Sequence, residues 1–232
     1  MALRAGGGRD LYRAPGSQTC KARYTASLTD RCASSTGTGL AELRQSSAGM
    51  TRRMSTVAAC TRTEMNLGLV EMMRYNAWAN DVLLAACREL TDEQLDHRLD
   101  VASGSTRELL VHIVGGQQTY VLRTMGRQHE GELDRDSEWP GMATLIELAT
   151  TTSAELVSIA ERLDPESEVT LPYLGRLYRY PIRFFLVHAT EHGVEHRTEV
   201  KLNLADAGFT TPDLDGWEYS EWADYGSEVA AP

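Results

Sequence analysis

The fold is decided by residues 181–204, PIRFFLVHATEHGVEHRTEVKLNL. The apolar residues of this stretch recur at the spacing of an α-helix. At about 100° per residue, these apolar side chains share one arc of the helix surface. His192 and His196 lie inside that arc, whereas His188 lies at its edge. The stretch therefore predicts a helix that directs two histidines towards the protein interior.

Three further segments carry an apolar stripe at helical spacing, namely residues 69–87, 105–126 and 145–163. Ser105 is followed three residues later by Glu108, which is the capping-box signal for a helix start. Four helices of about twenty residues predict an all-α fold, a four-helix bundle.

The segments around the last helix have a different pattern. Residues 168–180 flank Leu174-Gly175-Arg176 with β-branched and aromatic residues, which predicts an extended segment or a small hairpin. Residues 206–232 contain acidic and aromatic side chains but no basic one, and we expect them to fold back against the bundle through the aromatic rings.

Tyr75, Trp78 and Val82 lie opposite the inner stripe of the first helix, where a monomeric bundle should be polar. Either the C-terminal segment covers these side chains or they form a contact between two copies of the chain. We expect a homodimer.

Residues 1–64 lack apolar periodicity and are rich in Gly, Ser, Thr, Ala and Arg, so we expect a disordered extension followed by a folded domain over 65–232. The extension resembles an organelle leader in composition, but its lack of an amphipathic basic helix favours an upstream start codon. Because basic residues gather there, the domain itself is more acidic than the net charge of −10 implies.

Composition and charge also exclude several classes of partner. An acidic domain repels phosphate backbones, so we expect no nucleic-acid partner. No apolar run reaches the length of about 18 residues that a membrane span needs. The four cysteines form no CxxC pair, which argues against a disulfide framework or a zinc ribbon and favours a cytoplasmic protein.

The histidines indicate a metal site. Imidazoles four residues apart on a helix can reach one cation, and the inward pair is His192 and His196. A third ligand must come from another helix, where His112 is the only other histidine on an inner stripe; His97 and His129 flank loops and are expected on the surface. A hydrogen-bonded core histidine is the alternative for His112.

The string from His192 to His196 also matches the H-x-x-E-H motif of inverted zinc peptidases. Glu195 points away from the inner arc, and few residues follow to supply a distant acidic ligand. We therefore reject the peptidase interpretation.

Five short motifs follow one another along the chain: YNAWAN (75–80), LTDEQL (90–95), STRELLVHIV (105–114), HGVEHR (192–197) and DLDGW (213–217). In their order and spacing the sequence resembles the DinB/YfiT-like superfamily over roughly 66–225. The resemblance implies an up-down-down-up four-helix bundle, commonly homodimeric, in which His112, His192 and His196 hold a divalent metal ion. Where the family usually reads His-Arg-Gly-Gln, this chain has His-Arg-Thr198-Glu199, so the helix approach and polar contacts there are expected to differ.

The resemblance further implies a metal-dependent S-transferase, or a related enzyme, that acts with a low-molecular-weight thiol and an electrophilic small molecule. Zinc is the expected ion, with nickel, iron, cobalt or manganese as alternatives. A non-catalytic bundle with a structural ion is the competing interpretation. Asn76 and Asn80, on the inner face of the first helix, either orient substrate or metal-bound water or form a structural hydrogen-bonded pair.

We predict that residues 1–64 are dispensable, because every motif lies beyond them and they offer little apolar surface for packing. A chain that begins at Met65 should keep its thermal stability and its metal stoichiometry. Loss of either, measured by circular dichroism and by metal analysis, would place the extension within the domain.

Overall fold

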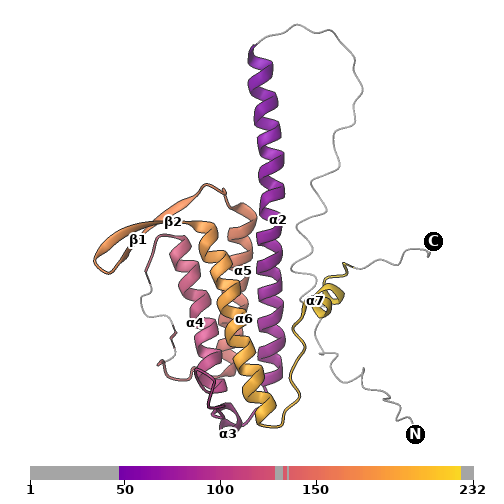
Figure 1. Ribbon diagram of the computed structural model, residues 1–232, viewed down its shortest axis with the longest axis vertical. Helices are drawn as coiled ribbons and strands as arrows, with labels where there is room; N and C mark the ends of the chain where they lie inside the picture. Colours follow the sequence, from indigo (N-terminus) through magenta and orange to yellow (C-terminus); the bar gives the residue numbers. More distant parts are fainter. Residues whose placement is uncertain (1–46, 129–132, 135, 226–232) are drawn as a thin grey trace, which may run out of the picture. The chain divides into compact units, whose positions relative to one another are not determined.

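The computed structural model describes residues 47–128, 133–134 and 136–225, and this part of the chain is mainly helical with one small sheet. The elements, in chain order, are α2 (Ser47–Cys87), α3 (Asp92–Leu95), α4 (Thr106–Thr124), α5 (Met142–Arg162), β1 (Glu168–Tyr173), β2 (Arg176–Pro181), α6 (Ile182–Asp206) and α7 (Gly216–Trp222). Figure 1 shows that α2 and α6 run in one direction while α4 and α5 run in the other.

Local signals in the sequence set where the helices begin. The Ser105 hydroxyl accepts a hydrogen bond from the backbone N–H of Glu108, and the Glu108 carboxylate accepts one from the Ser105 backbone. This capping box confirms the predicted start of α4. Thr91 and Gln94 cap the single turn of α3 in the same way.

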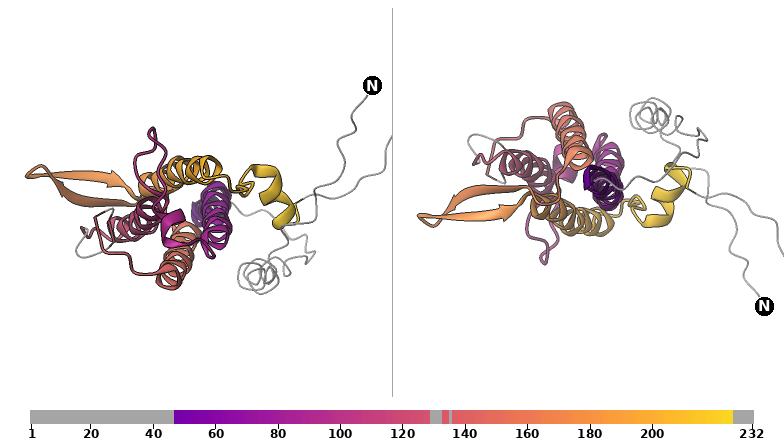
Figure 2. Two further views of the ribbon diagram at one scale, coloured as in Figure 1. Left: turned by 90° about the horizontal axis from the view of Figure 1, so that it is seen from below. Right: turned by 90° about the horizontal axis from the view of Figure 1, so that it is seen from above.

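A hairpin precedes α6, in agreement with the prediction for residues 168–180. Strands β1 and β2 pair antiparallel, and both residues of the turn have positive φ, 48° at Leu174 and 74° at Gly175. Two-residue turns of this kind match the twist of the strands they join. Pro181 is the residue before α6 and not its first helical residue, so the helix begins one residue later than expected. Figure 2 shows the hairpin projecting away from the helices.

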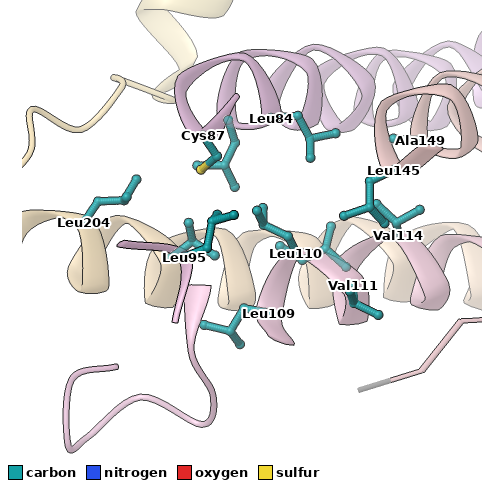
Figure 3. Packing of buried hydrophobic residues seen from close by; sticks show 13 residues of the cluster. Leu84, Cys87, Leu95, Leu109, Leu110, Val111, Val114, Leu145, Ala149 and Leu204 are labelled. Atoms are coloured by element: carbon teal, nitrogen blue, oxygen red, sulfur yellow. The ribbon is translucent and has the colours of Figure 1, made fainter. Parts of the chain in front are cut away.

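The apolar core lies between the helices. Buried side chains of α2, α4, α5 and α6 meet in one cluster, to which α3 contributes Leu95, and Figure 3 shows their side chains directed towards one another. The cluster contains Leu83, Leu84, Cys87, Leu95, Leu109, Leu110, Val111, Ile113, Val114, Leu145, Ala149, Val200 and Leu204. Burial of these side chains is the main contribution that holds the helices together.

Helix α2 begins at Ser47, within the segment that was expected to lack structure. Residues 47–64 contain no proline and several alanine, methionine and arginine residues, which favour helix without any apolar periodicity. The expectation for residues 1–46 lies outside the described residues, and the domain boundary at 65 stays a prediction. None of the described helices is long and apolar enough to cross a membrane.

The C-terminal segment covers the outer face of α2. The ring of Tyr219 lies 5.6 Å from that of Tyr75 and 5.5 Å from that of Trp78, measured between centroids. The Tyr75 hydroxyl donates a hydrogen bond to the backbone oxygen of Leu214, and Val82 packs against the same cluster. The C-terminal segment, and not a second copy of the chain, therefore covers Tyr75, Trp78 and Val82. This face of α2 gives no support for a homodimer.

We expect Tyr219→Ala to lower the free energy of unfolding by about 3 kcal/mol, because it removes a buried aromatic ring from this contact. Trp217→Ala is the matched control in the same helix: its side chain is 80% exposed, and its loss should change stability by less than about 0.5 kcal/mol. Urea unfolding of both variants tests the contact. Equal effects would contradict it.

Candidate metal centre

Helices α4 and α6 face each other in antiparallel register. His112 lies against His196, with ring centroids 4.6 Å apart, and one turn further along α4 Gly116 lies against His192. The next pair along the two helices is Tyr120 and His188, whose rings are 5.0 Å apart. Each step of one turn along α4 therefore corresponds to one turn back along α6.

This register brings together the three histidines that the sequence singled out. The Nε2 atoms of His112 and His192 lie 3.0 Å apart, and one ring nitrogen from each of the three residues lies within 4.8 Å of the others. Three imidazole ligands of a zinc ion need nitrogens separated by roughly 3–4 Å. The predicted convergence is confirmed, and the group could hold a divalent cation.

The remaining histidines lie elsewhere. The ring of His188 is 6.4 Å from that of His192 and outside the group of three, as its place at the edge of the arc indicated. His97 is half-buried and lies 2.8 Å from the carboxylate of Asp206. His129 lies outside the described residues.

Gly116 makes room for the histidines of α6. A Cβ atom at this position would lie 2.7 Å from Cε1 of His192, which is closer than real Cβ contacts allow. The absence of a side chain therefore lets the imidazole pack directly on the α4 backbone.

A carboxylate orients the most buried histidine. Oε2 of Glu199 lies 2.7 Å from Nδ1 of His196, and the carboxylate also accepts hydrogen bonds from the backbone N–H and the hydroxyl of Ser103, both at 2.9 Å. Because a carboxylate can only accept, Nδ1 of His196 donates to Glu199, which leaves Nε2 as the atom of this ring that could bind a cation. Burial raises the pKa of Glu199, but the hydrogen bonds from His196 and Ser103 outweigh this and hold it below its ordinary value.

The sequence marked position 199 as a departure from the family pattern but did not reveal this role. The available signal was the spacing of three residues between His196 and Glu199, which places both on one side of a helix. Thr198 is exposed and its hydroxyl bonds to the backbone oxygen of Val194. The close helix approach occurs instead at Gly193, where a Cβ atom would lie 2.6 Å from Oδ1 of Asn76.

Asn76 and Asn80 belong to a buried network and not to the histidine cluster. Their Oδ1 atoms both accept hydrogen bonds from Nη1 of Arg197 at 2.7 Å, and their Nδ2 atoms both donate to Oε1 of Gln117 at 2.8 Å. Nε2 of Gln117 then donates to the hydroxyl of Thr152 on α5. Since oxygen and nitrogen of both amides are used in this network, the structural role fits them better than a role in orienting substrate or metal-bound water.

Arg197 is the site residue that the sequence analysis missed. Its side chain is only 2% exposed and forms no ion pair with the described carboxylates. Burial lowers its pKa to about 10, and the neighbouring Tyr75 offsets this only in part. Nothing in the helical pattern separates such an arginine from a solvated one, because its acceptors lie on another helix.

Comparison with known proteins identifies the family. The sequence model of the DinB family matches residues 54–229. The chain belongs to the DinB family. Two solved structures are similar to it: a DinB-like protein from Bacillus cereus ATCC 10987 (21% identity, 63% of this chain and 95% of that chain, TM-score 0.49) and a DinB-like protein from Bacillus subtilis (20% identity, 63% and 97%, TM-score 0.45). No curated protein matches this DinB family member.

Proposed function

We propose that this DinB family protein binds a divalent metal ion through His112, His192 and His196. The observation that carries the proposal is the convergence of the three rings, one of which is oriented by a carboxylate on its far nitrogen. Such carboxylate–histidine pairs are the usual outer support of metal-binding imidazoles. Three neutral nitrogen ligands suit zinc best, and nickel, iron, cobalt and manganese are alternatives.

The ligand set supports an enzyme over a structural ion. In the part of the chain that the structure describes, no fourth histidine, cysteine or carboxylate joins the three histidines. Structural zinc sites are closed by four protein ligands, whereas catalytic sites keep a position open. His112 and His192 are half-buried, which leaves a route from solvent to such a position.

We propose the reaction class of a thiol S-transferase. A divalent ion at this site would lower the pKa of a thiol or water that binds to it and so supply a nucleophile near neutral pH. The three imidazoles would hold the ion. Glu199 fixes the tautomer and orientation of His196, and Gly116 leaves the space that the His192 ring occupies. The partners would be a low-molecular-weight thiol and an electrophilic small molecule.

We propose three further features of the protein. The four long helices α2, α4, α5 and α6 would form an up-down-down-up bundle, which their directions in Figure 1 support. The protein would be cytoplasmic, as its cysteine pattern favours, and homodimeric, as the family resemblance implies, through a face other than the one that the C-terminal segment covers. The alternative function is a bundle in which the ion only links α4 to α6.

Metal content and thiol transfer of the purified full chain test the proposal. We expect about one divalent ion per chain by mass spectrometry, and nearly complete loss of the ion in His112→Ala and His192→Ala. Zinc-loaded protein should accelerate transfer of a small thiol to an electrophile, and metal-stripped protein should not. Full metal content without thiol transfer, together with a lower Tm after stripping, would favour the structural ion; absence of metal would refute the site.

Glu199→Gln should weaken metal binding by about tenfold, because a neutral amide orients His196 less firmly than a carboxylate and makes it a weaker ligand. Glu195→Gln is the matched control, with the same loss of charge at an exposed position of the same helix. Competition with a zinc indicator measures both affinities. Equal weakening in the two variants would mean that only the general loss of negative charge matters.

A further inference from the structure

Beyond the histidines, the facing sides of α4 and α6 continue into a second group of side chains. We call Tyr120, Arg123, Phe184 and His188 the aromatic–basic cluster. The ring of Tyr120 lies 5.0 Å from that of His188, and Phe184 lies 5.5 Å from His188. The guanidinium carbon of Arg123 lies 5.9 Å from the centroid of the Tyr120 ring.

The aromatic–basic cluster adjoins the histidines directly. Tyr120 contacts both His188 and His192, the latter at 5.7 Å between ring centroids. The His192 ring packs on Gly116 of α4. Arg123 lies seven residues further along the same helix, which corresponds to about 10 Å along its axis. Because Tyr120 contacts both His188 and His192, a ligand held by the cluster lies next to the three histidines.

One buried polar atom of the cluster lacks a partner within the described residues. Nδ1 of His188 is buried and accepts or donates no hydrogen bond there. The Tyr120 hydroxyl forms none with the described residues, and Arg123 forms no ion pair with their carboxylates. Buried polar atoms in proteins almost always have a partner, so Nδ1 of His188 indicates one from outside the chain, next to the Tyr120 ring that Arg123 also contacts.

The chemistry of the cluster specifies that partner. Arg123 offers a cation with paired donors, which suits a carboxylate. Phe184 is 44% exposed, so its ring offers an aromatic surface for a planar ring, whereas Tyr120 is buried beneath the cluster. Ligand sites typically combine such an apolar lining with a few convergent polar groups.

We propose that the aromatic–basic cluster binds a small aromatic carboxylate as the second substrate of the metal site. The ring packs against Phe184, and the carboxylate pairs with Arg123 and accepts a hydrogen bond from Nδ1 of His188. The other end of the molecule then lies at the three histidines. The assignment of the ligand as a substrate rests on the proposed function, whereas its binding does not.

Binding of 2-naphthoate and of its neutral match 2-naphthamide to the full chain tests this site. We expect calorimetry to show that naphthoate binds more tightly than the amide. Arg123→Gln should weaken naphthoate by about tenfold, which is the loss of one charge-assisted hydrogen bond, and leave naphthamide unchanged. His188→Ala should weaken both ligands, because each has a carbonyl oxygen that can accept a hydrogen bond from Nδ1.

Arg127→Gln is the matched control, since it removes the same charge from an exposed position just beyond α4 and should leave both affinities unchanged. Equal binding of the two ligands, no binding of naphthoate, or equal effects of the two arginine variants would overturn the proposal. Metal content is measured in the same samples. Loss of metal with Arg123-dependent naphthoate binding intact would refute the metal function alone, and the reverse result would refute the cluster alone.

Discussion

A guanidinium buried away from water must find its hydrogen-bond acceptors within the protein, and Arg197 finds them on α2. Asn76 and Asn80 accept from it and in turn donate to Gln117 of α4, which donates to Thr152 of α5. The donors and acceptors follow one another in a single direction from the cation outward. Because the oxygen and the nitrogen of each amide bond to different helices, a shift of one helix along another would break these hydrogen bonds.

This constraint also decides where the histidines point. Successive residues on a helix lie about 100° apart, so when Gly193 and Arg197 face α2, His192 and His196 turn towards α4. On that side Gly116 accepts the His192 ring at a distance that no larger residue would allow. The histidine cluster is thus held from two sides, by a polar network behind α6 and by a glycine in front of it.

The chain then adds features of its own around the histidines. Glu199 connects His196 to Ser103, which lies in the segment before α4, so the same carboxylate orients a ring and holds a loop. A carboxylate at this position places a negative charge next to the His196 imidazole, where the family pattern has a neutral amide. The facing sides of α4 and α6 continue beyond the site into the aromatic–basic cluster, so one pair of helices supplies both the proposed metal ligands and the proposed substrate contacts.

The amino-acid sequence by itself determined the features that depend on near neighbours. Ser105 and Glu108 specify the start of α4, Leu174-Gly175 the turn of the hairpin, and the spacing of four residues between His192 and His196 their common face, because each is a relation within one or two helical turns. Tertiary structure alone decided the roles of residues whose partners lie far along the chain. Arg197 donates hydrogen bonds to side chains 117 and 121 residues away in the sequence. Glu199 accepts hydrogen bonds from Ser103, 96 residues away, and Tyr75 donates one to Leu214, 139 residues away. Periodicity shows which way a side chain faces along its own helix, but the group it meets depends on how the helices pack.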